Sequence, residues 1–243
     1  MTGRPGSAVH DGSLGCPRDS RLLAWGVVGV IAQAAFMAGW LIAETWQGPG
    51  YSPVKDTISD LQAATASHVW FPVACFAAGG VGTFGFAVFG LRPALAAAGQ
   101  AAPYAPWMLA CSALALGNSF PLIPCRLADP GCTAHHQLAS PGGLTDAIIA
   151  SIAFLVLAVT PFPLWRRLKE LPRWQRHKPV MMTARVAGPV CYLLLGITSN
   201  AGIAEGLAER ILATTCVLWM CALAVTLISV SRPAPVNLAS ATG

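Results

Sequence analysis

Residues 22–43 read LLAWGVVGVIAQAAFMAGWLIA, a run of about 22 residues that contains no charged side chain. About 20 consecutive apolar residues are enough for one α-helix to cross the hydrocarbon core of a bilayer. Five more apolar runs follow, and their predicted bounds are 69–91, 104–123, 147–164, 180–199 and 211–230. Because lipid offers no hydrogen-bond partners to the backbone, each run is expected to form a helix. The sequence therefore predicts an all-α polytopic transmembrane bundle of six helices.

The composition excludes an ordinary soluble protein. Of the 243 residues, 55% are hydrophobic and only 10% are charged, whereas soluble domains carry about 25% charged residues. No polar stretch is long enough to fold separately, so one transmembrane domain is expected over residues 21–231, between cytoplasmic tails at 1–20 and 232–243. The first tail is rich in Gly, Ser and Pro, and it is predicted to be disordered.

The basic residues predict how the bundle is oriented. If both termini are cytoplasmic, the three outer loops hold only Lys55, Arg126 and Arg210. The inner segments then hold Arg4, Arg18, Arg21, Arg92, Arg166, Arg167, Lys169, Arg173, Arg176, Lys178, Arg185 and Arg232. This excess on one side follows the positive-inside rule and predicts an N-in/C-in topology. The net charge of +5 does not indicate a nucleic-acid partner, because the charges are spread over short loops.

Two of the spans leave alternatives open. Arg21 before an apolar run and the Ala32-Gln33-Ala34 triplet also resemble a signal peptide with its cleavage site. The run continues well past that triplet, which favours a retained span. The fifth span contains Arg185, which is expected to snorkel to the inner side, and Pro189, which is expected to kink the helix.

Two cysteines of the second outer loop predict a disulfide. Cys125 and Cys132 flank the sequence Asp129-Pro130-Gly131, which favours a turn that brings the sulfur atoms together. An extracytoplasmic loop faces an oxidising space, where a disulfide persists. The neighbouring His135 and His136 raise the alternative of a zinc site, but their spacing does not follow the usual zinc-ligand patterns. No metal and no cofactor are therefore expected.

The first outer loop, residues 44–68, is longer than most connections, and such loops are commonly functional or disordered. Residues 56–66 are predicted to form one or two helical turns. One interpretation is that Asp56 or Ser59 caps such a turn. The other interpretation is that Ser59 and Asp60 face a cavity at the outer side of the bundle.

Several short motifs, in order and in place, resemble the DUF998 family of bacterial six-span membrane proteins. They are Asp56-Thr-Ile-Ser-Asp60-Leu, Asn118-Ser-Phe-Pro121, Asp129-Pro130, Gly143-Leu-Thr-Asp146 and Gly206-Leu-Ala-Glu209-Arg210. The resemblance covers residues 22–230 and implies a six-helix bundle in a bacterial plasma membrane. Two positions depart from the pattern: Gln62 stands where the family has glycine, and Thr145 stands where a histidine is common. The family label implies no activity.

The resemblance implies that a set of polar residues meets at the outer ends of the helices. The candidate vestibule residues are Ser59, Asp60, Asp129, His135, His136, Asp146, Glu209 and Arg210. Ionisable groups near the membrane boundary are costly unless they face a wet cavity or a partner. Arg210 is expected to pair with Asp60 or Asp146. Glu205, Glu209 and Arg210 could alternatively form a solvated cluster where the last helix starts.

Three functions remain open at this point. The leading hypothesis is a vestibule that recognises a lipid headgroup or a small polar ligand, with membrane lipids as partners. The first alternative is a membrane-embedded hydrolase or transferase, which would need Ser59, Asp60, a histidine and Asp146 close together, with or without a metal held by Asp60, His135, His136 and Asp146. The second is a permease, which would need a cavity that reaches the middle of the membrane. The oligomeric state is not predicted.

Overall fold

The structure is a computed structural model that describes residues 20–99, 104–117, 120, 122–169, 171, 174 and 178–231. The predicted tails, apart from Ser20, lie outside the described residues. So do Asn118 and Pro121 of the third family motif.

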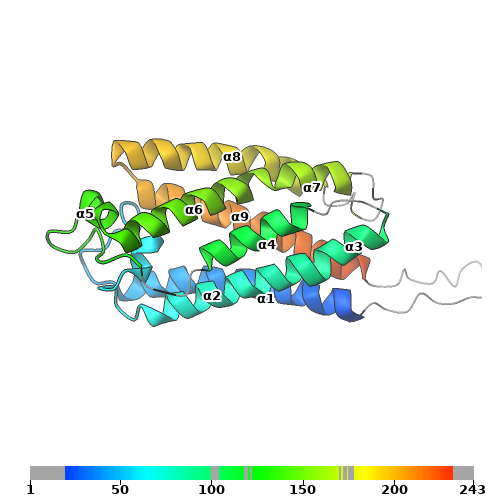
Figure 1. Cartoon of the computed structure of the whole chain (residues 1–243), viewed down its shortest axis with the longest axis horizontal. Helices are drawn as coiled ribbons and strands as arrows, with labels where there is room; N and C mark the ends of the chain where they lie inside the picture. The colour runs from blue at the N-terminus through cyan, green and yellow to red at the C-terminus, as the bar shows by residue number, and fades with distance from the viewer. Residues whose placement is uncertain are drawn as a thin grey trace, which may run out of the picture.

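In the described residues six helices form a bundle along one axis, and those that follow one another in the chain run in opposite directions (Figure 1). They are α1 (Ser20–Ala43), α2 (Trp70–Gly85), α4 (Tyr104–Leu116), α6 (Pro141–Val159), α8 (Lys178–Ala201) and α9 (Glu205–Val230). Three short helices extend or connect them, namely α3 (Arg92–Ala97), α5 (Ala134–Ala139) and α7 (Pro161–Leu168). Every regular element in these residues is helical, so the all-α prediction is confirmed.

Five helical segments are long and apolar enough to cross a membrane within the described parts of the chain. They are Ser20–Trp46, Trp70–Ala97, Pro141–Leu168, Lys178–Ala201 and Glu205–Val230. The predicted third span, 104–123, was too long, because α4 has only 13 residues. Such a helix measures about 20 Å, which is less than the roughly 30 Å of a hydrocarbon core. Gly117 and Pro121 both disfavour a longer helix.

The second span continues beyond its predicted end at residue 91. A π-helical segment, η3 (Phe86–Leu91), follows α2 and leads directly into α3. The Arg92 amide donates to the Ala87 carbonyl, five residues earlier. Pro93 lies in the first turn of α3, directly after the π-helical segment. Arg92 and Pro93 therefore do not stop this helix.

The last three long helices also start earlier than predicted. The Ser140 hydroxyl caps α6 by accepting from the Gly143 amide at 2.9 Å, so this helix begins at Pro141 and not at residue 147. Beyond Thr160 the chain continues as α7 to Leu168. α8 is one continuous helix with Pro189 inside it. α9 begins at Glu205 and not at residue 211, which places Glu209 and Arg210 in its first two turns.

The two ends of the bundle differ. α5, the first loop and the second loop lie at one end, which we call the disulfide end (Figure 1). The start of α1 and the end of α9 lie together at the opposite end, which we call the terminal end. Between them, α9 forms much of the core with fully or almost fully buried residues such as Leu212, Trp219 and Leu223.

Candidate functional site

The first loop is folded at the disulfide end by a reciprocal pair of hydrogen bonds. The Asp60 amide donates to the Thr57 hydroxyl at 3.1 Å, and the Thr57 amide donates to the Asp60 carboxylate at 2.9 Å. This is the geometry of a capping box, and it opens the short 3-10 helix η2 (Ser59–Gln62). The predicted helical turn therefore exists. The reciprocal bonds between Thr57 and Asp60 hold its start, and neither Asp56 nor Ser59 caps it.

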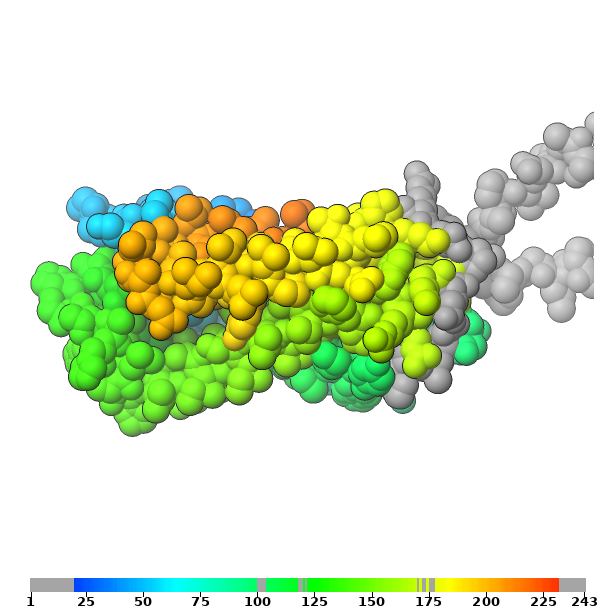
Figure 2. All heavy atoms as spheres, turned by 90° about the horizontal axis from the view of Figure 1, so that it is seen from above, coloured from blue at the N-terminus to red at the C-terminus, as the bar shows by residue number. Residues whose placement is uncertain are grey.

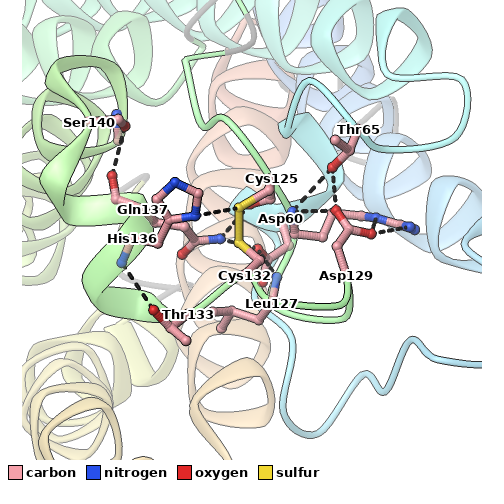
Figure 3. Close-up of a disulfide and its surroundings, with 12 residues drawn as sticks. Asp60, Thr65, Cys125, Leu127, Asp129, Cys132, Thr133, His136, Gln137 and Ser140 are labelled. Atoms are coloured by element: carbon pink, nitrogen blue, oxygen red, sulfur yellow. Dashed lines mark hydrogen bonds and ion pairs between the residues drawn. A yellow bond between two sulfur atoms is a disulfide. The ribbon is translucent and has the colours of Figure 1, made fainter.

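Asp60 also connects the first loop to the second loop and to α5 (Figure 3). Its side chain is completely buried. The second carboxylate oxygen accepts from the Leu127 amide at 3.2 Å and from the Gln137 side chain at 2.8 Å. Four hydrogen bonds thus hold this carboxylate in place.

The second loop is closed by the predicted disulfide, Cys125–Cys132, with Cα atoms 6.2 Å apart (Figure 3). The Arg126 guanidinium forms an ion pair with Asp129 at 2.6 Å and donates to Gln47 in the first loop. Burial acts to raise the pKa of Asp129, but hydrogen bonds from Arg126 and Thr65 outweigh this effect and hold its pKa below the ordinary value. Asp129 is therefore a structural residue of this loop.

Loss of the disulfide is expected to destabilise the second loop. Closing a loop of this length limits the unfolded chain and stabilises the fold by about 2–3 kcal/mol. The double variant Cys125→Ser and Cys132→Ser should therefore melt at a lower temperature than the oxidised wild type. Reduction with dithiothreitol should produce the same shift in the wild type and none in the variant. As a matched control, Cys111→Ala removes an exposed free thiol and should leave the melting temperature unchanged.

The start of α9 is buried against the first loop. Glu209 and Arg210 are only 6% and 7% exposed, so the alternative of a solvated cluster of Glu205, Glu209 and Arg210 is wrong. The Glu209 carboxyl accepts from the Ile58 amide at 2.6 Å. A Cβ at Gly206 would lie 2.1 Å from the Asp56 carbonyl oxygen, so only glycine permits this close approach. The family-like segments around residues 56–61 and 206–210 are thus in direct contact.

The sequence predicted that Arg210 pairs with Asp60 or Asp146, and this prediction is wrong. The Arg210 guanidinium forms an ion pair with Glu44 at 3.3 Å and donates to the Tyr51 hydroxyl. It also donates to the carbonyl oxygens of Pro53, Asp56 and Gly206 at 2.8–2.9 Å. Two of these carbonyls, those of Pro53 and Asp56, belong to the folded first loop, and the third belongs to Gly206 in the first turn of α9. Sequence spacing does not reveal this arrangement.

Burial perturbs two ionisable groups around this arginine. It raises the pKa of the Tyr51 hydroxyl well above the usual range, although the positive charge of Arg210 acts in the opposite direction. Burial also raises the pKa of Asp56, against the effect of the hydrogen bond from the Ser52 amide. Both residues belong to the part of the first loop that contacts Arg210.

A cleft of about 400 Å³ opens at the disulfide end between α6, α8 and the start of α9. Figure 2 shows the surface hollowed between α6 and the C-terminal part of α8. Its polar lining comprises Thr57, Ser59, Gln137, Asp146, Ser151, Tyr192, Ser199, Asn200, Glu205 and Glu209. Its apolar lining includes Ile123, Leu127, Leu138, Ala150, Phe154 and Leu195.

The cleft exists because α6 and α8 diverge toward the disulfide end. Near the terminal end they are in close contact, and a Cβ at Gly188 would lie 3.0 Å from the Ala158 carbonyl oxygen. The buried residues of α8 end at Cys191, and of its last ten residues only Tyr192 and Leu195 pack partly against the core. In α6, the stretch from residue 144 to residue 152 contains no buried residue either.

The structure brings together only part of the predicted vestibule set. Ser59, Asp146 and Glu209 line the cleft. Asp60 and Arg210 lie in the loop contacts described above, and Asp129 lies in the second loop. His135 and His136 are exposed on α5 and do not line the cleft. Asp60, a histidine and Asp146 therefore do not meet in one site.

Some cleft residues were not among the candidates. Gln137 follows the two histidines and connects α5 to both loops, since its side-chain amide donates to Asp60 and to the Cys125 carbonyl. Ser199 and Asn200 come from the polar end of α8. Polar residues at the end of an apolar span could have indicated Ser199 and Asn200 as candidates. The sequence does not show, however, toward which neighbours their side chains point.

The described residues offer little for a metal or for a central channel. Their one group of at least three possible metal ligands is Cys125, Cys132 and His136, and both cysteines are bonded to each other. A cavity of about 30 Å³ lies deeper in the bundle, next to a buried hydrogen bond of 2.7 Å from Gln33 to Thr83. Such a cavity holds one or two waters, so it is too small for a solute of a permease.

Comparison with known proteins identifies the family. No curated protein and no solved structure matches the chain. Residues 30–226, most of the sequence, match the family described as "Protein of unknown function (DUF998)". The segments that meet around Asp60, Glu209 and Arg210 all lie within this match. This chain is a multi-pass membrane protein that belongs to the DUF998 family.

Proposed function

We propose that this protein binds an amphiphilic molecule, with a polar headgroup in the cleft and an apolar chain along α6 and α8. The observation that carries this proposal is the cleft itself, which is open at its side between two helices of the bundle. A site that opens sideways admits a molecule from the surrounding lipid.

The order of side chains along the cleft supports an amphiphile. On α8, Ser199 and Asn200 lie nearest the disulfide end, and Leu195 lies one turn deeper. On α6, Asp146 is followed one and two turns deeper by Ala150 and Phe154. Most polar groups therefore lie at the level expected for headgroups, and apolar groups lie at the level of the lipid chains. The exceptions are Ser151 on α6 and Tyr192 on α8, which line the deeper part of the cleft.

The outward face of the same helices is apolar. Ile148, Ile152, Leu193 and Ile197 are each more than half exposed, as side chains in contact with lipid would be. A lipid chain would thus find a continuous apolar surface from the cleft to the bilayer.

We propose further that the disulfide end faces the extracytoplasmic side of a bacterial plasma membrane. Disulfides persist in oxidising compartments. The excess of basic residues in the segments at the terminal end is what the positive-inside rule requires for that orientation.

Hydrolysis of lipid has less support. The described lining of the cleft contains Ser59 and three carboxyl groups but neither histidine nor cysteine. Asp60, which a catalytic cluster would need, is completely buried and fully engaged in hydrogen bonds.

Filling the cleft tests the proposal. Gly196 lines the cleft, and a Cβ there would meet no atom within 4 Å. Gly196→Phe should therefore occupy the cleft without disturbing the fold. We expect native mass spectrometry of the purified protein, titrated with an equimolar mixture of phosphatidylethanolamine, phosphatidylcholine and phosphatidylglycerol, to show bound lipid on the wild type. The variant should bind about tenfold less.

The matched control is Ile197→Phe, one residue along α8, where the side chain is 65% exposed to the lipid side. It should bind lipid as the wild type does. Lipid binding that is unchanged in Gly196→Phe, or the absence of bound lipid on the wild type, would refute the proposed function.

A further inference from the structure

A small recess leads from the cleft toward the axis of the bundle. It shares Ser59, Asp146 and Glu209 with the cleft, and it is closed on its inner side by apolar residues that include Phe36 and Phe76. Its volume is about 30 Å³, enough for one or two groups the size of a water molecule. The recess therefore suits the tip of a headgroup and not a whole headgroup.

Gln62 lines this recess and carries a buried, unsatisfied acceptor atom. Its side chain lines the recess and is only 8% exposed. Its Oε1 has no hydrogen-bond partner among the described residues. A buried acceptor without a partner destabilises a folded chain, so a group that donates a hydrogen bond to it would remove this penalty. At this position Gln62 also departs from the glycine of the family-like motif.

The ionisable groups of the recess are carboxyls. Glu209 is 6% exposed, and the Ile58 amide fixes one of its oxygens. Asp146 contributes the second carboxyl. Neither the cleft nor the recess is lined by a lysine or an arginine among the described residues. The adjacent Arg210 directs its guanidinium to carbonyl oxygens of the first loop. The recess is therefore suited to a donor with positive charge.

A divalent metal fits this recess poorly. Calcium takes six to eight oxygen ligands, and magnesium requires a near-octahedral set. Within the described residues, Asp146 and Glu209 do not belong to a group of three acidic or other ligands close enough to hold one ion. A primary ammonium needs fewer partners, since it carries three N–H donors on a group about the size of a water molecule.

We propose that the recess is an ammonium subsite, in which a primary amine donates to the Gln62 Oε1 and lies beside the Glu209 and Asp146 carboxyls. This inference rests on the proposed lipid binding and names its class of ligand, a lipid with a primary amine in its headgroup. The lipid chains would lie outside the recess, along α6 and α8. Phosphatidylethanolamine has this chemistry, whereas phosphatidylcholine has no N–H donor and phosphatidylglycerol has no positive charge.

The test compares headgroups on the full chain in detergent. We expect phosphatidylethanolamine to bind about tenfold more tightly than phosphatidylcholine or phosphatidylglycerol, since hydrogen bonds to charged groups are the stronger ones. Gln62→Met keeps the size of the side chain but removes the acceptor. It should reduce this preference to less than twofold, retain overall lipid binding and leave the melting temperature unchanged or higher. Ala64→Met, at an exposed position of the same loop, should keep the full preference.

A thermal-shift arm with free ethanolamine distinguishes the source of the amine. Equal binding of the three lipids, together with stabilisation by ethanolamine that Gln62→Met abolishes, would assign the subsite to a free amine. Equal binding of the three lipids without an ethanolamine effect would overturn the subsite while leaving the cleft proposal intact. Equal stabilisation by sodium or calcium chloride would also overturn it. If the wild type binds neither lipid nor ethanolamine, both proposals fail.

Discussion

Arg210→Ala is expected to destabilise the folded protein by about 3–5 kcal/mol, the range found when one partner of a buried ion pair is removed. The guanidinium is buried and donates to two carbonyls of the first loop, the Gly206 carbonyl of α9, the Tyr51 hydroxyl and Glu44. Alanine would leave all of them without this donor. The melting temperature, followed by tryptophan fluorescence of the purified protein in detergent, should fall by about 10 °C.

Two further variants make this experiment decisive. Arg210→Lys keeps the charge but not the planar set of five donors, so most of the loss should remain. Arg166→Ala removes an exposed arginine of α7 and should change the stability by less than about 0.5 kcal/mol. If Arg210→Ala melts within about 2 °C of the wild type, a central structural role for Arg210 is excluded.

Asp60→Ala should separate the two loops at the disulfide end. The substitution would remove the acceptor for the Thr57 amide, the Leu127 amide and the Gln137 side chain. A buried donor left without its partner costs about 1–3 kcal/mol, so we expect a loss of about 3 kcal/mol in total. Asp60→Asn retains an acceptor oxygen of the same shape, and its loss should be smaller.

The second readout is local. In the folded protein, Arg126 is held by Asp129 and Gln47 in a loop that Asp60 binds through Leu127. Tryptic cleavage after Arg126 should therefore become at least about tenfold faster in Asp60→Ala, since local opening by 1.4 kcal/mol corresponds to a factor of ten. Lys55→Ala, an exposed position of the first loop, should leave this rate unchanged. An unchanged rate in Asp60→Ala would show that the second loop holds its shape alone.

The sequence predicted only some of the residues that line the cleft and the proposed subsite. Asp146 and Glu209 were candidates because carboxyls next to apolar runs are costly. Gln62 was noted only as a departure from a motif, and its unpaired oxygen could not be inferred. His135 and His136 attracted attention because of their chemistry, yet they lie exposed on α5, where they do not line the cleft.

Features that depend on local composition could be predicted from the amino-acid sequence. Apolar runs of membrane length specified helices, because backbone groups in lipid leave no alternative. The disulfide was predicted because Cys125 and Cys132 are only seven residues apart and flank an Asp-Pro-Gly turn. The end of α4 was predicted too late, because hydropathy responds to apolar content, whereas Gly117, which follows the helix, has a low helix propensity.

Tertiary structure alone decided the direction of side chains and the spacing of helices. Arg210 turns to carbonyls that exist as a set only when the first loop is folded. The cleft arises because α6 and α8 are in contact at Gly188 and Ala158 but diverge beyond them. Both features depend on contacts between residues far apart in the chain, and the apolar pattern of a single helix reports that a face is covered without specifying its neighbour.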